Sequence, residues 1–331
     1  MKYCLTGATG FIGGRVARQL AAAGHQVTAV VRRPAQAQDL AAAGITLHQG
    51  DVTEKETLRA PMAGADGVFH IAGWYKVGAR DKRAGARINI QGTQNVLEVM
   101  RDLGIPKGVY TSTLAVNSDT RGRLVDETYH FAGRRHLSEY DRTKAAAHAL
   151  AEAFCAQGLP LVIVQPGLVY GPGDTSSVRT SLIQYLRRQL PVIPRQAAYS
   201  WGHVDDIARG HVLAMERGRP GQNYFVCGPA HTLVEAFHLA AEITGQPAPP
   251  AAPPAVFKTL AAVMSGLDHF LPVPDSYTGE GLRTIAGVTY IGDNAKARRE
   301  LGWEPRPLRE GWAETVRHEL RLLGRSAAKE G

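Results

Sequence analysis

The sequence predicts an α/β fold: a doubly wound parallel sheet of the Rossmann type, with a smaller C-terminal lobe. Three observations predict it. Short apolar segments of strand length alternate with segments of helix length through the first half of the chain. A glycine-rich turn follows the first strand and opens the first helix. After about residue 171 the alternation stops, and five prolines between residues 246 and 254 predict no regular structure there.

Six strands are expected in the first half, each followed by a segment long enough for a helix or a crossover. Parallel neighbours require crossovers, which place helices on both faces of the sheet. Two helices are well marked, at 11–23 and at 140–157, the second ending at Gly158. The tail from 293 to 323 has a helical pattern with a break at 302–305. The strands are expected at 3–5, 27–31, 45–47, 67–71, 108–111 and 161–164.

The domain organisation follows from the length and from this change of pattern. A chain of 331 residues exceeds the usual size of a single domain. We expect a dinucleotide-binding domain at 1–170 plus about 195–228, and a substrate-binding lobe at about 171–194 and 229–331. Open α/β sheets bind ligands at the carboxyl ends of their strands, so the lobe should lie over those ends.

Composition disfavours several classes of function. The formal net charge is +8, but basic residues are spread along the chain in pairs, so we expect no nucleic-acid partner and a field favourable to a polyanionic cofactor. Cys4, Cys155 and Cys227 are far apart without metal-type spacing, so neither a disulfide framework nor a metal site is expected. No apolar run reaches ~18 residues and no leader pattern precedes the first strand, which indicates a soluble cytoplasmic protein without a membrane span.

The turn at 6–13, TGATGFIG, has the glycine spacing of a dinucleotide-binding turn between strand and helix. Gly7 permits the tight turn, Gly10 lets the backbone approach a pyrophosphate, and Gly13 lets the helix pack on the strand. The helix N-terminus adds free N–H donors and positive potential. The residues expected to bind cofactor here are Gly7, Thr9, Gly10, Phe11, Ile12 and Gly13.

The end of the second strand predicts NADP(H) rather than NAD(H). An NAD enzyme would carry an acid there for the adenosine ribose, but this strand runs into Arg32 and Arg33, and the first acid is Asp39. Two guanidiniums suit a 2′-phosphate, although they could also be a solvated strand end. Asp51, with Val52, is placed to meet the adenine edge, or could only cap a helix.

Tyr140 and Lys144 are four residues apart in a predicted helix, so they share one face. A phenol is a poor acid or base at neutral pH, and a neighbouring ammonium should lower its pKa. The pair alone could equally be a surface lysine beside a tyrosine. The hydroxyls of the run 110–113, at the end of the fifth strand, raise the case for catalysis, because one of them could polarise a substrate carbonyl.

Taken together, these motifs resemble the extended short-chain dehydrogenase/reductase family, part of the NAD-dependent epimerase/dehydratase superfamily, and particularly its dihydroflavonol-4-reductase-like branch. The matching segments follow the family's order over nearly the whole chain. They are TGATGFIG at 6–13, VFHIAG at 68–73, INIQGTQNVL at 88–97, YTST at 110–113, YDRTK at 140–144, QPGLVYGPGD at 165–174, HVDDIA at 203–208 and AKARRELGWEP at 295–305.

The resemblance implies that Tyr140 is the general acid and base, that Lys144 is its partner and a cofactor ligand, and that Thr113 binds the carbonyl. The family more often has Ser at the position of Thr113, and Ser112 is a second candidate. Asn89 matches a family position near the cofactor and an active-site water, or could be a helix cap. The resemblance further implies that Pro166 and Val169 border the nicotinamide. Ile71 and Ala72 are also expected to bind the cofactor.

The resemblance also bears on the substrate. Related nucleotide-sugar epimerases and dehydratases commonly carry an Arg six residues before the first Asp of the HVDD segment, where this chain has Tyr199. Aromatic walls suit an uncharged or hydrophobic carbonyl, although buried aromatics are more often core. The expected pocket residues are Trp74, Tyr75, Asn117, Tyr199 and Trp201.

These observations together predict an NADP(H)-dependent oxidoreductase that reversibly reduces a ketone or aldehyde to an alcohol. One alternative is a nucleotide-sugar epimerase or dehydratase that uses the same site and retains its cofactor. Another is a non-enzymatic NADP sensor, which would not need Tyr140, Lys144 and Thr113 together. The expected partner is a small carbonyl or alcohol substrate, and the resemblance makes a homodimer an expectation.

Overall fold

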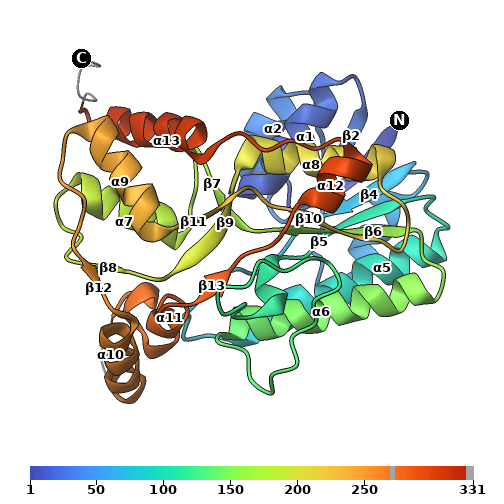
Figure 1. Cartoon of the computed structure of the whole chain (residues 1–331). Helices are drawn as coiled ribbons and strands as arrows, with labels where there is room; N and C mark the ends of the chain where they lie inside the picture. Colours follow the sequence, from blue (N-terminus) through green and yellow to red (C-terminus); the bar gives the residue numbers. More distant parts are fainter. Residues whose placement is uncertain (269–272, 326–331) are drawn as a thin grey trace.

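The computed structural model describes residues 1–268 and 273–325, and its larger part is a seven-stranded parallel sheet between two layers of helices (Figure 1). The strand order is β10-β6-β5-β4-β1-β2-β3, and every neighbouring pair is parallel. The order reverses between β1 and β4, so the crevice expected of a doubly wound sheet lies there. The strands are β1 (Lys2–Thr6), β2 (Gln26–Val31), β3 (Thr46–Gln49), β4 (Gly67–His70), β5 (Gly108–Thr111), β6 (Leu161–Pro166) and β10 (Asn223–Val226).

Alternation along the strands explains the two helix layers. On one face, Leu5 and Phe69 pack in a core with α1 (Phe11–Ala22) and α8 (Val204–Arg217). On the other face, Cys4 and Tyr110 join the core beneath α5 (Gly92–Asp102) and α6 (Glu139–Ala156). Both faces are therefore covered, as the apolar strands predicted. Shorter helices are α2 (Gln38–Ala42), α3 (Arg59–Met62) and α4 (Arg83–Gly85).

The second lobe lies at the left of Figure 1, around a small sheet in which β9 (Ala198–His203) pairs with β7 (Leu168–Tyr170), β11 (Ala230–Thr232) and β13 (Thr289–Tyr290). Its core contains Tyr170, Trp201 and Trp312. The helices around it are α7 (Ser177–Leu186), α9 (Leu233–Thr244), α10 (Pro254–Leu267), α11 (Gly279–Arg283) and α13 (Leu308–Leu322).

The proline-rich segment departs from the prediction of no regular structure. Ala251–Ala252, the two residues between its proline pairs, form β12 and pair with β8 (Ile193–Pro194). Pro254 then opens α10, where proline costs nothing because the first N–H of a helix has no intrahelical partner.

One segment of the expected substrate lobe packs elsewhere. Helix α12 (Ala295–Leu301) lies against α8 and β10, and Trp303 is buried in the core beside α8. The domain boundaries given above stay a prediction.

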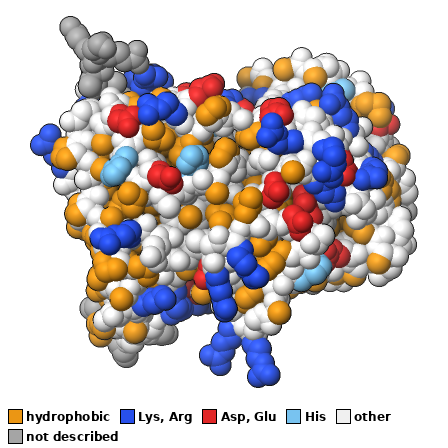
Figure 2. Space-filling view, viewed as in Figure 1, with side chains coloured by type: hydrophobic (Ala, Val, Ile, Leu, Met, Phe, Trp, Pro, Cys, Tyr) orange, Lys and Arg blue, Asp and Glu red, His pale blue; other side chains and the backbone are white. Residues whose placement is uncertain are grey.

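Helix α10 exposes an apolar stripe. Val256, Leu260, Val263 and Leu267 are all exposed on it, and Figure 2 shows hydrophobic side chains over this corner of the molecule. Among the described residues, none of the helices combines the length and apolarity needed to cross a bilayer.

Candidate active site

The glycine turn after β1 has the geometry of a phosphate-binding turn. Gly7 has φ +80°, and a Cβ on Gly13 would lie 2.1 Å from the Gly7 carbonyl oxygen, so helix and turn approach as closely as glycine allows. No acid occupies the first turn of α1, and no side chain caps it. Within the described chain, the N–H groups of Phe11, Ile12 and Gly13 have no hydrogen-bond partner, so they are available to an anion.

Arg32 and Arg33 follow β2 directly, and both side chains are exposed. Neither makes an ion pair or a side-chain hydrogen bond with any described residue, unlike Arg18 nearby, which pairs with Asp39. The first acid after β2 is thus already paired. The end of this strand therefore offers two free guanidiniums.

The other expected cofactor residues lie along the same edge of the sheet. Ala72 touches the turn, since a Cβ on Gly7 would lie 2.5 Å from the Ala72 nitrogen, and Ile71 precedes it at the end of β4. Asp51 uses one carboxylate oxygen to accept hydrogen bonds from the N–H and hydroxyl of Thr53, both at 2.9 Å, so it also stabilises its own turn. Val52 is buried beside it, while Pro166 ends β6 and Val169 lies on β7.

Thr113 and Tyr140 meet at the carboxyl end of β5. The Thr113 hydroxyl hydrogen-bonds the Tyr140 hydroxyl, which lowers the pKa of the phenol, but burial is the larger effect and raises that pKa to about 12. The ammonium was expected to lower the tyrosine pKa, whereas desolvation outweighs every opposing influence. Tyr140 therefore holds its proton at neutral pH.

Lys144 lies one helical turn further along α6, with its side chain buried. Its Nζ donates to the Thr111 carbonyl oxygen at 2.7 Å and to the Tyr110 hydroxyl at 3.2 Å, and it lies 4.8 Å from the centre of the Tyr110 ring. Loss of solvent lowers the pKa of Lys144 to about 7. The lysine is therefore no snorkelling surface residue, and small changes around it can decide its charge.

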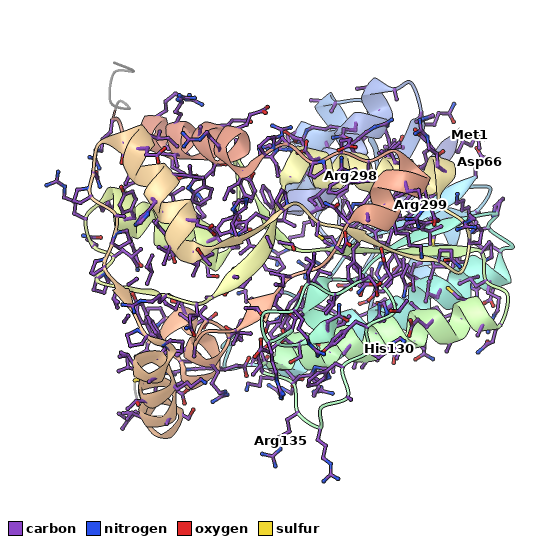
Figure 3. All side chains as sticks on the ribbon, in the orientation of Figure 1. Met1, Asp66, His130, Arg135, Arg298 and Arg299 are labelled. Atoms are coloured by element: carbon purple, nitrogen blue, oxygen red, sulfur yellow. The ribbon has the colours of Figure 1, made fainter. Side chains whose placement is uncertain are left out.

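Ser112 faces away from this pair. Its hydroxyl hydrogen-bonds His148 Nδ1 at 2.9 Å, and His148 lines a cavity of about 230 Å³ on the flank of α6. Asn117, expected in the substrate pocket, lines the same cavity, together with His130, which Figure 3 labels beside α6. Thr113, and not Ser112, is thus the hydroxyl beside Tyr140.

Asn89 fixes the loop that follows β4. It lies in a π-helical turn (Ala86–Gln91), where its carboxamide accepts from the Trp74 N–H at 2.7 Å and donates to the Trp74 carbonyl at 2.9 Å and to the Thr143 hydroxyl at 3.0 Å. This residue is no helix cap. It connects the Trp74 backbone to Thr143 on the helix that carries Tyr140, so it holds these two parts of the site in place relative to each other.

Of the four expected pocket aromatics, Trp74 and Trp201 are buried, whereas Tyr75 is exposed and Tyr199 is partly exposed. Trp201 is 1% exposed, packs against Tyr170 and Trp312, and donates its indole N–H to the His231 carbonyl, so it belongs to the core of the second lobe, and its role in a pocket stays a prediction. Tyr75 is exposed and hydrogen-bonds Thr175, which belongs to the other half of the chain. Tyr199 is partly exposed and stacks on Tyr290.

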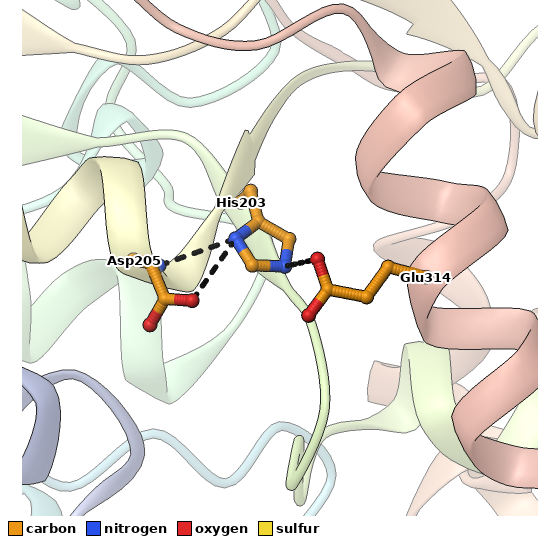
Figure 4. A group of neighbouring side chains, drawn as sticks. All are labelled: His203, Asp205 and Glu314. Atoms are coloured by element: carbon orange, nitrogen blue, oxygen red, sulfur yellow. Dashed lines mark hydrogen bonds and ion pairs between the residues drawn. The ribbon is translucent and has the colours of Figure 1, made fainter.

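His203, Asp205 and Glu314 form a cluster between α8 and α13 (Figure 4). The two carboxylates flank different ring nitrogens: Asp205 lies 3.7 Å from Nδ1 and Glu314 3.5 Å from Nε2. Nδ1 also accepts the Asp205 backbone N–H at 3.3 Å. One metal ion would have to lie in line with a single ring nitrogen, so this arrangement links the helices rather than surrounding an ion.

Three polar residues lie beneath the site, of which sequence reasoning considered only Tyr110, as part of the run 110–113. His70, Thr93 and Tyr110 are all buried and are joined to one another, and Tyr110 contacts Lys144. His70 was visible as the polar residue that ends an otherwise apolar strand, although its partners lie far away in sequence.

Comparison with known proteins agrees with this geometry. A family model described as the NAD dependent epimerase/dehydratase family matches residues 3–228. A putative dihydroflavonol 4-reductase of Synechocystis sp. is 31% identical over 95% of this chain and 93% of its own length. A UDP-glucose 4-epimerase of Streptomyces lividans is 28% identical over 92% of this chain and 91% of its own. The crystal structure of gox2253 superposes with a TM-score of 0.85 at 27% identity, covering 98% of this chain and 99% of that one.

The fold, the glycine turn and the Thr-Tyr-Lys arrangement agree with the matched model, which spans more than half of the chain. The chain therefore belongs to the NAD-dependent epimerase/dehydratase family, the extended short-chain dehydrogenases/reductases, in which its relatives are named both reductases and epimerases.

Proposed function

We propose that this chain is an NADP(H)-dependent oxidoreductase that reduces a ketone or aldehyde to an alcohol and runs the reaction in reverse. One observation carries the proposal: the Thr113 side chain lies close enough to the Tyr140 hydroxyl to lower the Tyr140 pKa, at the carboxyl edge of the sheet and with Lys144 buried one turn away. A carbonyl oxygen placed between two such hydroxyls would accept from both.

The preference for NADP(H) rests on the end of β2. Free N–H groups at α1 fit a pyrophosphate, and Arg32 and Arg33 fit a 2′-phosphate because no described carboxylate neutralises them. The same strand end carries no free acid for a ribose, since Asp39 is paired with Arg18.

When bound, the reduced nicotinamide supplies a hydride to the carbonyl carbon. Tyr140 gives its proton to the carbonyl oxygen as negative charge develops there, so the product is a neutral alcohol. Because burial raises its pKa to about 12, Tyr140 holds that proton until the oxygen becomes basic enough to take it. Thr113 orients the same oxygen, and the Lys144 ammonium stabilises the phenolate that remains. Asn89 keeps the Trp74 backbone fixed beside them.

A nucleotide-sugar epimerase remains the second candidate, because a relative with that name covers most of the chain. Against it, Tyr199 occupies the position at which the related sugar enzymes commonly carry an Arg for the diphosphate, and it stacks on Tyr290. A phenol ring cannot neutralise two phosphates, so an uncharged substrate suits the site better.

The test is a panel of ketones and aldehydes followed by NADPH absorbance, with wild-type chain, Tyr140→Phe and Tyr224→Phe. Tyr140→Phe removes one oxygen, so turnover should fall by about 10² to 10⁴ while cofactor affinity stays. Thr113→Ser should stay active and Thr113→Ala should not. The control Tyr224→Phe removes the hydroxyl of a buried tyrosine on the edge strand β10, away from Tyr140, and should turn over substrate as the wild type does. Conversion of a nucleotide sugar without net NADPH consumption would overturn the proposal in favour of an epimerase.

A further inference from the structure

A chain of buried side-chain hydrogen bonds leads from Lys144 to the cofactor turn. Lys144 Nζ donates to the Tyr110 hydroxyl at 3.2 Å, and the Thr93 side chain lies close enough to that hydroxyl to lower the Tyr110 pKa. The Thr93 hydroxyl lies 3.0 Å from His70 Nε2, and His70 Nδ1 lies 2.7 Å from the hydroxyl of Thr6, the residue before Gly7. Every member of this chain is buried.

The chemistry of the members fixes the direction of these bonds. Burial, with the nearby Lys144 charge, lowers the pKa of His70 to about 3, so its imidazole is neutral and one ring nitrogen must accept. An ammonium can only donate, so Tyr110 accepts from Lys144 and donates to Thr93, and Thr93 donates to His70 Nε2. His70 then donates from Nδ1 to Thr6. In this arrangement each bond of the chain has one donor and one acceptor.

The surroundings of Lys144 contain no opposing charge. The titratable groups facing it are Tyr110 on β5, His70 on β4 and Tyr140 on its own helix, and no carboxylate among the described residues pairs with it. The hydroxyl of Tyr110 and the carbonyl of Thr111 are therefore what stabilises a charge at Nζ. The Tyr110 ring is held in turn by stacking on His70, at 5.5 Å between ring centres.

We propose that Tyr110, Thr93 and His70 are positioning residues that hold Lys144 as an ammonium ion with a fixed direction. The proposal rests on the proposed function, because the ammonium matters only if Tyr140 becomes a phenolate. The structure favours this positioning role over a purely structural one, since each side chain is the hydrogen-bond partner of the next along the chain from Lys144 to Thr6. A polar chain of this kind in a core is costly unless all its bonds are made.

The test uses full-length protein labelled with ¹³C in its lysine side chains, titrated by NMR without and with NADP⁺. Lys144→Met identifies the Lys144 signal. Tyr110→Phe removes the accepting oxygen and keeps the ring, so the Lys144 pKa should fall by about one unit, roughly a tenfold loss of ammonium at a given pH. Thr93→Val should shift it in the same direction by less. Tyr224→Phe is the matched control and should leave it unchanged.

Kinetics supply the second readout. In Tyr110→Phe the high-pH fall of kcat should move to lower pH by a similar amount, while KM changes little. An unchanged Lys144 titration in both Tyr110→Phe and Thr93→Val overturns the proposal, and Thr93→Val decides alone if Tyr110→Phe does not fold. Because the NMR titration needs no substrate, its result stands even if the chain reduces no carbonyl, which separates this inference from the proposed function.

Discussion

Removing Arg32 and Arg33 together should abolish a preference for NADPH over NADH, and removing either one alone should reduce it. The two cofactors differ by one phosphate, so NADH is a control built into the experiment. A hydrogen bond to a charged group contributes about 1.5 to 3 kcal/mol, and the lower end applies because both arginines are exposed and screened by salt. Arg32→Ser and Arg33→Ser should therefore each weaken NADPH binding roughly tenfold, and the double variant by up to about a hundredfold.

Calorimetric titration with both cofactors gives the NADPH and NADH affinities of each variant, which are compared with the same two affinities of the wild type. NADH affinity should change by less than about twofold, since neither arginine makes an ion pair or a side-chain hydrogen bond with the described residues. For the same reason the variants should melt at the wild-type temperature. The control is Arg135→Ser, an exposed arginine at the end of the loop below α6 in Figure 3, which should change nothing. A wild-type preference for NADH, or an unchanged NADPH to NADH ratio in the double variant, would refute the reasoning.

Two further predictions concern the turn and the lysine. Gly13→Ala would place a Cβ 2.1 Å from a backbone oxygen, so α1 must shift and cofactor affinity, measured by calorimetry, should fall at least about tenfold. In the control Gly14→Ala, the atom nearest to the new Cβ is the movable end of Arg18 at 3.1 Å, so cofactor affinity should fall far less. Equal losses of affinity in the two variants would contradict the role of Gly13. For Lys144, the folded-state pKa of about 7 lies below the unfolded value of 10.5, so the unfolded chain binds more protons between these values and this group makes stability rise with pH across that window. Urea denaturation at several pH values should show that Lys144→Met loses this rise, and an unchanged slope would mean that folding does not lower the Lys144 pKa.

Much of the fold was predictable because its signals are local. Strand and helix periods, and the glycines of the 6–13 turn, depend on neighbours in sequence, and the structure has β1, α1 and α6 within a residue or two of the expected bounds. The Tyr140 and Lys144 pair was found for the same reason, since four residues make one helical turn.

The remainder depends on contacts between distant segments. Ser112 and Thr113 are adjacent and chemically alike, and only the placement of His148 on α6 shows which way each points. Trp201 is indistinguishable in sequence from a pocket residue until Trp312 packs on it. The rise in the Tyr140 pKa, where a fall was expected, comes from burial, which no spacing reveals.

The interleaved order of the two sheets has a consequence for how the chain reaches its native state. In the smaller sheet β9 pairs with β13, some ninety residues later, and the edge strand β10 of the large sheet comes after β9. The smaller sheet cannot complete its hydrogen bonding before Thr289 and Tyr290 have been synthesised, whereas β10 is available to β6 some sixty residues earlier. Nascent chains should thus expose the edge of β9 that pairs with β13 until residue 290 has been synthesised, and during that interval the edge is open to aggregation or chaperone capture.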